Sequence, residues 1–336
     1  MLFREDLERR EFDVLSKYAV KSAASKGRVY PEEKCDIRTE FQRDRDRIVH
    51  SKSFRRLMHK TQVFLAPEGD HFRTRLTHTI EVSQIARTIA RALNLNEDLT
   101  EAIALGHDLG HTPFGHNGEE VLNKIHPCGF KHNVQSLRVA DVIESTSSRR
   151  GMNLTMEVRD GIVNHTGAEL PFTLEGQIVR VSDRIAYINH DIDDAIRSRV
   201  ISSSDLPEDA IKVFGASHRE RINNMVEDVI RNSDGMPTIK QSEIFKTKLD
   251  ELRTFMFANV YKSSKVKREE DLNKVEVVIS SLYEYFIGNI DKLPEDMRQI
   301  AERDGKNEAV KDYVAGMTDR YALATYTELF VPKGWK

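Results

Sequence analysis

Two imidazoles and two carboxylates are present in a pattern that could close around one metal ion. They belong to His78, the adjacent pair His107 and Asp108, and Asp183, and six of the twelve histidines fall between positions 78 and 132. Two nitrogen and two oxygen ligands suit Mn, Fe, Co, Ni or Zn better than Ca. The alternative is that these histidines are hydrogen-bonded core residues and that the acids are helix caps. The whole set favours the metal site, because buried imidazole and charged groups are costly unless they are paired or metal-bound.

The segment that follows the His-Asp pair contains a second group. From His107 to Glu119 it reads HDLGHTPFGHNGE, which adds His111 and His116. Its glycines and proline allow tight turns, so the histidines can point into one cavity. Glu119 follows His116 by three residues, and such a carboxylate can orient the imidazole and favour its protonated form. We therefore expect His116 and Glu119 to work together as a general acid or base.

Basic residues precede the first histidine of the metal set. Arg73 and Arg75 stand just before His78, and Lys60 and Gln62 stand about a dozen residues earlier. Guanidinium groups beside a metal site are suited to bidentate contacts with phosphate oxygens, which the metal alone could not neutralise. We therefore expect the two arginines nearest His78 to bind phosphate.

Helices must carry these residues. From position 77 to 95, apolar residues recur at steps of three and four, which predicts an amphipathic helix with His78 on its apolar face. A second helix is expected over 96–110, where apolar residues share a face with His107. The third helix is long, over 175–199, and a stripe beside its apolar face carries Asp183, Tyr187 and Asp191.

The adjacent positions of His107 and Asp108 constrain the metal site. Neighbouring residues on a regular helix point about 100° apart. Both side chains can reach one ion only if the helix loses its regular geometry at this pair. Gly106 and Gly110 favour such an interruption.

Composition indicates a soluble, helical, globular chain. Of its 336 residues, 39% are hydrophobic and 31% are charged, and glycine and proline are too few for a turn-rich β protein. The net charge of −3 gives no overall field that would attract nucleic acid or a membrane. Two cysteines, no apolar signal segment and no apolar run long enough to cross a bilayer predict a cytoplasmic protein. Shorter helices are predicted over 117–125, 132–145, 155–165, 244–261 and 272–288.

The motifs that contain these residues resemble those of the HD-domain deoxynucleoside triphosphate triphosphohydrolases, in particular the bacterial dGTPase-like proteins. The matching segments are FRRLMHKTQVF (54–64), TRLTHTIEV (74–82), GHDLGHTPFGHNGEE (106–120), DRIAYINHDIDDA (183–195) and VAGMTDRYA (314–322). The resemblance implies an all-α fold, an HD-domain helical bundle with a C-terminal helical extension. We expect an N-terminal helical segment that contributes to the site, a metal-dependent phosphohydrolase core and an extension packed on the core, over 1–60, 61–200 and 201–336.

The resemblance also implies roles for individual residues. The metal ligands would be His78, His107, Asp108 and Asp183, and the catalytic pair would be His116 and Glu119. The phosphate contacts would be His111, His132 and Arg75. Contacts with the deoxyribose 3′-hydroxyl would come from Gln62 and Asp191, in a pocket lined by Tyr187. A tyrosine that packs on the sugar and excludes a 2′-hydroxyl corresponds to Tyr261.

These roles predict a hydrolase that converts a deoxynucleoside triphosphate, dGTP or several dNTPs, into deoxynucleoside and inorganic triphosphate. Water would attack the α-phosphorus, with Mn, Mg, Fe, Co, Ni or Zn as the divalent metal ion, and His116 would protonate the leaving 5′-oxygen. Two alternatives stay open. One is an HD-type phosphohydrolase acting on a nucleoside monophosphate or another phosphoester, and the other is a non-catalytic HD protein that binds nucleotides or nucleic acid. The surplus of phosphate-binding groups favours a triphosphate.

Two expectations about partners follow from the resemblance. Related proteins form homo-oligomers, often hexamers or tetramers, and the C-terminal helices are the natural place for contacts between subunits. Several family members bind single-stranded nucleic acid, and the near-neutral charge predicts that such binding is weak here. No membrane partner is expected.

Overall fold

A computed structural model describes residues 3–62, 73–261 and 269–332 of the chain. Over these ranges the chain forms sixteen α-helices and no strand, so the predicted all-α class is confirmed. No helix in this part of the chain is both long and apolar enough to span a membrane.

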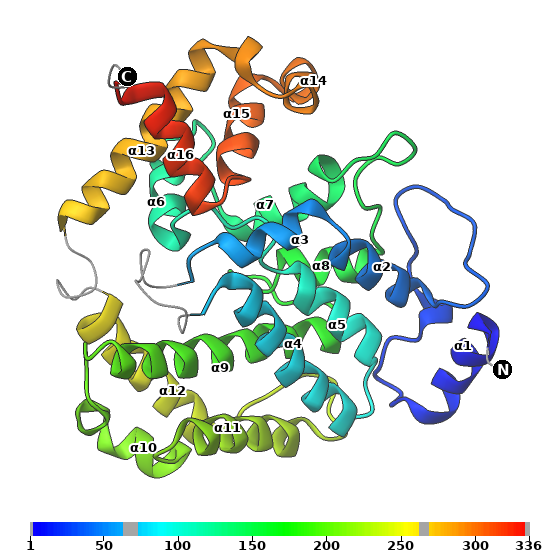
Figure 1. Cartoon of the computed structure of the whole chain (residues 1–336). Coiled ribbons are helices and arrows are strands. Elements are labelled where there is room, and N and C mark those ends of the chain that lie inside the picture. Colours follow the sequence, from blue (N-terminus) through cyan, green and yellow to red (C-terminus); the bar gives the residue numbers. More distant parts are fainter. Residues whose placement is uncertain (1–2, 63–72, 262–268, 333–336) are drawn as a thin grey trace.

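Three helices form the centre of the fold (Figure 1), and each was predicted from hydrophobic periodicity. They are α4 (Arg75–Ala92), α5 (Glu97–Gly106) and α9 (Leu174–Arg197), and they pack against one another. Their contact faces are almost inaccessible to solvent and are built by Ile85, Ile89, Leu99, Ile103, Ile178 and Ile185. The branched apolar side chains at helical spacing therefore form one buried stripe on each helix, as their periodicity predicts.

The other helices surround this centre or extend from it. They are α1 (Arg4–Val14), α2 (Glu40–Val49), α3 (Lys52–Arg56), α6 (Gly115–Ile125), α7 (His132–Arg138), α8 (Met156–Val163), α10 (Glu208–Phe214), α11 (His218–Ser233), α12 (Glu243–Met256), α13 (Glu269–Gly288), α14 (Glu295–Asp304), α15 (Lys306–Ala315) and α16 (Asp319–Phe330). Two π-helical turns, Val139–Ile143 and Phe257–Tyr261, continue α7 and α12. The shorter helices predicted from the sequence correspond to α6, α7 with its π-turn, α8, α12 with its π-turn, and α13.

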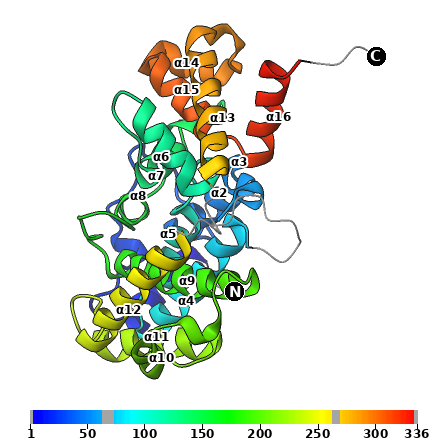
Figure 2. The ribbon, with the colours of Figure 1, turned by 90° about the vertical axis from the view of Figure 1, so that its left-hand side faces the viewer.

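Two hydrophobic clusters form the interior. The larger one joins the three central helices to α10, α11 and α12, through residues such as Phe214, Met225 and Leu252. The smaller one joins α13–α16 to α6, with Leu122 and Ile279 among its buried members. Figures 1 and 2 show α10–α12 at one end of the molecule and α13–α16 at the other. The predicted division of the chain at residues 60 and 200 stays a prediction, and apolar contacts continue across residue 200.

A buried carboxyl group links the N-terminal segment to the first turns of two central helices. Glu175 Oε1 accepts hydrogen bonds from the N–H groups of Val20 (3.0 Å) and Asn96 (3.1 Å), and Asn96 in turn caps α5. Glu175 Oε2 is buried and has no partner among the described residues. Burial raises the pKa of Glu175 to about 7, although the backbone hydrogen bonds oppose this shift. The protonated form therefore suits this environment best.

We predict that Glu175 makes folding less favourable as the pH rises. Its pKa in the folded chain lies above the ordinary value of 4.5, so the stabilisation is complete below 4.5 and is lost as the pH rises through about 7. The loss should reach about 3 kcal/mol in the free energy of unfolding. Urea unfolding of wild type and Glu175→Gln, compared between pH 4.5 and 8.5, checks this, because all other groups cancel in the difference. A difference that does not change with pH would contradict it.

Candidate active site

The end of α5 releases the His-Asp pair from helical geometry. The helix ends at Gly106, and residues 107–110 form a turn. Gly106 also allows close packing, since a Cβ there would lie only 2.7 Å from Ile162 Cδ1 in α8. The expectation that the regular helix is interrupted at this point is confirmed. His107 and Asp108 can consequently face the same group of side chains.

The four predicted metal ligands meet at one point of the fold. His78, His107 and Asp108 each place a ligand atom within 4.8 Å of the others. Asp183 Oδ1, from α9, lies 3.1 Å from His78 Nε2 and 3.9 Å from His107 Nε2. Residues that are far apart in sequence thus come together because α4, the end of α5 and α9 pack against one another.

His107 offers a test of whether a cation fits this cluster. Its Nδ1 donates a hydrogen bond to the Ala104 carbonyl oxygen at 2.6 Å, so in the neutral ring Nε2 carries a lone pair. That Nε2 is buried, lacks a hydrogen-bond partner within the described ranges, and lies 3.6 Å from Asp108 Oδ1. A buried lone pair beside two carboxylates is costly unless a positive charge accompanies it. The donor set therefore fits a divalent metal ion.

Positive neighbours keep the carboxylates of the cluster ionised. Arg75 Nη1 donates to Asp108 Oδ2 at 2.7 Å, and both side chains are buried. Burial opposes ionisation of Asp108, but His107, His111 and Arg75 hold the pKa of its carboxyl well below the usual range. Burial acts in the same sense on Asp183, whereas the His78 ring lowers the pKa of that carboxyl to about 2. Both groups are thus charged at neutral pH, as metal ligands must be.

A second carboxylate, Glu119, connects two histidines beside the metal cluster. Its oxygens lie 3.2 Å from His116 Nδ1 and 2.9 Å from His132 Nδ1. Burial raises the pKa of Glu119, but the two imidazoles outweigh burial and hold it far below its usual range. The His116 side chain is 69% exposed. Its second nitrogen is consequently accessible to a ligand, while Glu119 orients the ring.

His132 is fixed at both of its nitrogens. Besides the contact with Glu119, its Nε2 lies 3.3 Å from His165 Nε2, and His165 Nδ1 donates to the Ile162 carbonyl oxygen. Burial lowers the pKa of His132, but the bond to Glu119 raises it above its ordinary value. Burial and the neighbouring histidines lower the pKa of His165 to about 3. We infer that His132 is the protonated member of this pair and donates to His165.

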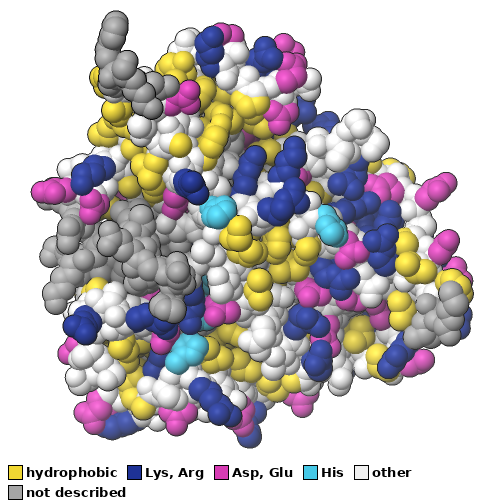
Figure 3. All heavy atoms as spheres, viewed as in Figure 1, with side chains coloured by type: hydrophobic (Ala, Val, Ile, Leu, Met, Phe, Trp, Pro, Cys, Tyr) yellow, Lys and Arg dark blue, Asp and Glu magenta, His cyan; other side chains and the backbone are white. Residues whose placement is uncertain are grey.

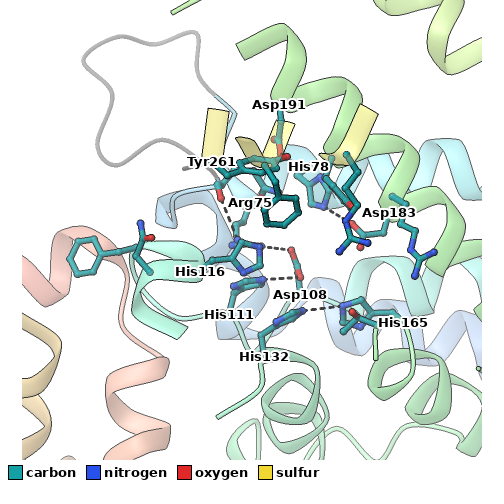
Figure 4. Close-up of a pocket in the computed structure, with 18 residues that line it drawn as sticks. Arg75, His78, Asp108, His111, His116, His132, His165, Asp183, Asp191 and Tyr261 are labelled. Carbon is teal, nitrogen blue, oxygen red and sulfur yellow. Dashed lines mark hydrogen bonds and ion pairs between the residues drawn. The ribbon is translucent and has the colours of Figure 1, made fainter. Parts of the chain in front are cut away.

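These groups border a cavity of about 450 Å³ (Figure 4), within the size range of small-molecule sites. All the residues to which the resemblance assigns a role line the cavity except two, His107 and Glu119. The exceptions contact lining residues directly, His107 through the metal cluster and Glu119 through His116 and His132. The stripe predicted along α9 is also present, with its three members Asp183, Tyr187 and Asp191 all on the cavity wall.

One wall of the cavity contains side-chain oxygens that accept no hydrogen bond from any described residue. Tyr261, at the end of the π-helical turn, donates its hydroxyl hydrogen to Asp191 Oδ2. Asp191 Oδ1 and Gln62 Oε1 are buried, and neither has a hydrogen-bond partner in the described part of the chain. Burial raises the pKa of Asp191 to about 7. Buried polar atoms are normally paired, so this wall has the character of a binding surface for a polar ligand.

Two basic residues named from the sequence lie outside the cavity. Arg73 pairs with three carboxylates, those of Glu81, Asp193 and Asp194, so the expectation that it binds phosphate is wrong. Lys60 is buried, and its ammonium group donates to backbone carbonyl oxygens. Sequence proximity to His78 did not reveal these tertiary partners.

The cavity also contains residues that the sequence analysis missed. Arg184 and Arg253 line it, and neither forms an ion pair with any described residue. The guanidinium carbon of Arg253 lies 5.6 Å from the centre of the Phe257 ring. A signal existed for Arg184, which directly follows Asp183. His165 and Arg253 had no such signal, because only the packing of α8 and α12 brings them to the cavity.

Comparison with known proteins adds information about the whole chain. Residues 75–188 match the HD domain, and residues 239–328 match the Phosphohydrolase-associated domain. The chain is 59% identical to a deoxyguanosinetriphosphate triphosphohydrolase-like protein of Caldanaerobacter subterraneus subsp. tengcongensis, over 100% of this chain and 98% of that protein. Proteins of the same name from Desulfatibacillum aliphaticivorans and Clostridium tetani are 49% and 48% identical, over 99% of this chain and 99% and 97% of their own lengths.

A solved structure is also similar. It belongs to a hypothetical protein from Aquifex aeolicus and aligns over 86% of this chain and 68% of that chain, with 20% sequence identity and a TM-score of 0.49.

We predict that Asp108→Ala abolishes metal binding. Loss of an outer-sphere partner typically lowers metal affinity by about 10- to 100-fold. Loss of a direct ligand should lower it further, so we expect a decrease of about 100-fold or more. Elemental analysis of the purified variant checks this. Asp193→Ala is the matched control, because Asp193 pairs with Arg73 and Arg197 outside the cavity. Full metal occupancy in Asp108→Ala would reject Asp108 as a ligand.

Proposed function

We propose a function from one premise: the chain belongs to the HD-domain family of deoxyguanosinetriphosphate triphosphohydrolase-like proteins. The function is metal-dependent hydrolysis of a deoxynucleoside triphosphate to deoxynucleoside and inorganic triphosphate. One observation carries this proposal. A single cavity combines a cluster that fits a metal ion, arginines without ion-pair partners among the described residues, and a wall with unpaired oxygens.

The groups beside the metal cluster that can donate hydrogen bonds to phosphate support a triphosphate substrate. His111, His132 and Arg75 correspond to phosphate contacts in the family, and Arg184 and Arg253 add two further cations on the same cavity. A monophosphate would leave Arg184 and Arg253, which have no ion-pair partner among the described residues, without an anion to bind. Guanidinium groups suit phosphate oxygens because they can donate two parallel hydrogen bonds.

The wall with unpaired oxygens supports recognition of a deoxyribose. Gln62 Oε1 and Asp191 Oδ1 are the buried, unpaired oxygens of the described cavity, and either can accept the hydrogen of a 3′-hydroxyl. Tyr261 is held against Asp191 by its hydroxyl, and its ring would then pack against the sugar. By its correspondence to the family tyrosine, Tyr261 would exclude a 2′-hydroxyl, and Tyr187 would line the same pocket.

The residues of the site divide the hydrolytic step among them. A divalent cation held by His78, His107, Asp108 and Asp183 would supply a Lewis acid for the α-phosphate and the attacking water. His116 donates a proton to the 5′-oxygen as the bond between that oxygen and the α-phosphorus breaks. The water oxygen becomes part of the triphosphate, one of the water protons is released to solvent, and His116 takes up a proton from solvent before the next turnover. Glu119 holds His116 in orientation for this transfer.

A homo-oligomer stays a prediction for this chain. The outer face of α16 exposes Tyr321, Leu323 and Phe330, and Figure 3 shows hydrophobic side chains gathered over α13 and α16. Such a surface is suited to burial between subunits. Weak binding of single-stranded nucleic acid also stays a prediction.

We predict that the wild-type chain with Mn²⁺ and dGTP releases inorganic triphosphate. Ion-exchange separation of the products checks this, and a reaction in ¹⁸O-labelled water locates the attacked atom. Label in the triphosphate supports attack on the α-phosphorus. Orthophosphate or pyrophosphate in place of triphosphate would favour a different phosphohydrolase. A parallel reaction with GTP tests the discrimination assigned to Tyr261.

We also predict that His116→Ala retains its metal and loses about 10²- to 10⁴-fold in kcat, the range that general acid catalysis typically provides. Steady-state kinetics and elemental analysis of the same preparation check this. Loss of the metal together with activity would show that His116 acts in metal binding and would overturn its role as the acid.

A further inference from the structure

The motif VAGMTDRYA, residues 314–322, has no part in the proposed reaction. One of its side chains nevertheless binds the backbone of two loops that carry site residues. Asp319 is the first residue of α16. Its Oδ1 accepts a hydrogen bond from the Phe114 N–H at 2.9 Å. Its Oδ2 accepts one from the Thr61 N–H at 3.0 Å and another from the Thr61 hydroxyl. One carboxylate therefore joins two loops that are far apart in sequence.

Each of these loops carries a residue of the proposed site. Thr61 directly precedes Gln62, and Phe114 stands two residues before His116. The loops also approach each other closely, since a Cβ at Gly115 would lie 3.3 Å from the Gln62 carbonyl oxygen. The backbone position of the general acid and that of the sugar contact thus depend on the same bridge.

The loop of the general acid has a conformation that needs support. Phe114 has φ 62° and ψ 23°, in the left-handed region that is unfavourable for residues other than glycine, and Gly115 follows with φ 58°. Asp319 binds the Phe114 N–H, and the Thr112 hydroxyl donates to the Gly115 carbonyl oxygen at 2.7 Å. The Phe114 ring lines the cavity and also belongs to the hydrophobic cluster of α13–α16.

A second bridge runs parallel to the first. Lys60 is buried, and its ammonium group donates to the carbonyl oxygens of His111 and, at 2.9 Å, Ala315. His111 lies in the loop of the general acid, and Ala315 lies in the same motif as Asp319. The junction between α15 and α16 is therefore joined to both loops by the side chains of Lys60 and Asp319.

We propose that Asp319 is a positioning residue, through which α16 sets the spacing between the loop of Gln62 and the loop of His116. This inference rests on the proposed function and deepens it. Asp319 does not line the cavity itself, and it acts through the two backbone segments that it binds. The C-terminal helices thereby become part of the catalytic apparatus.

Asp319→Asn is the sharpest variant for testing this. The asparagine keeps the size of the side chain and one acceptor oxygen, but its amino group would face a backbone N–H that can only donate. One loop is therefore released while α16 remains. Asp304→Asn is the matched control. Asp304, at the end of α14, accepts a hydrogen bond from Arg138 Nη2 of α7 at 2.8 Å, so it also joins the C-terminal helices to the rest of the chain, but it contacts neither loop.

We predict that Asp319→Asn lowers kcat/KM for dGTP by about 10- to 100-fold, since small displacements of a reacting group have effects of this size. Metal content and the unfolding midpoint should equal those of Asp304→Asn, whose activity should stay within about twofold of wild type. In a His116→Ala background, Asp319→Asn should cost less than about threefold, because residues that act as a unit are not additive. Wild-type activity in Asp319→Asn, or a full additive loss in the double variant, would overturn the proposal.

Hydrogen exchange supplies a measurement that does not depend on turnover. Amide exchange at Thr61 or over residues 111–117 should be faster in Asp319→Asn and unchanged in Asp304→Asn, because the asparagine amino group replaces the acceptor of one of these two backbone segments. Unchanged exchange in Asp319→Asn would overturn the inference. Failure of the wild-type chain to form triphosphate from any dNTP would instead overturn the proposed function, and the exchange result separates the two cases.

Discussion

This structure depends on one constraint. Charged and imidazole groups are removed from water where three amphipathic helices meet. Asp108 and His107 are almost inaccessible, and Asp108 is ionised there only because Arg75 and several imidazoles surround it. An arrangement of this kind is costly as a purely structural device, since apolar side chains of similar size would pack without a desolvation penalty. The cost is understandable where a cation and an anionic ligand complete the set. The fold can therefore be seen as a support for this one buried group of charges.

Periodicity predicted the elements that carry the site, because local spacing alone determines which face of a helix is apolar. The helices α4, α5 and α9 were predicted in this way, and so was the stripe of Asp183, Tyr187 and Asp191. The interruption of α5 followed from the glycines that flank the His-Asp pair. These predictions needed no knowledge of the tertiary structure. The roles of the residues gathered there remain proposals.

Features that depend on distant partners could not be predicted from local pattern. Arg73 was expected to bind phosphate, but it pairs with carboxylates of α4 and α9. Arg253 and His165 reach the cavity only because of how α12 and α8 pack. The structural roles of Lys60 and Asp319 depend on contacts with residues that lie more than half of the chain away in sequence. In each case the residue type was visible in the sequence, but its partner was not.

Phe114 belongs to two environments at once, since its ring lies on the cavity wall and in the core of α13–α16. A change of side-chain volume deep in that core is therefore transmitted to the rim of the cavity, because close-packed interiors pass on displacement rather than absorb it. Substitutions in the core of these helices should consequently affect the cavity as well as the stability of the helices. The same coupling could be used in protein engineering, because a substitution in this core could alter substrate preference without changing any residue that contacts the substrate.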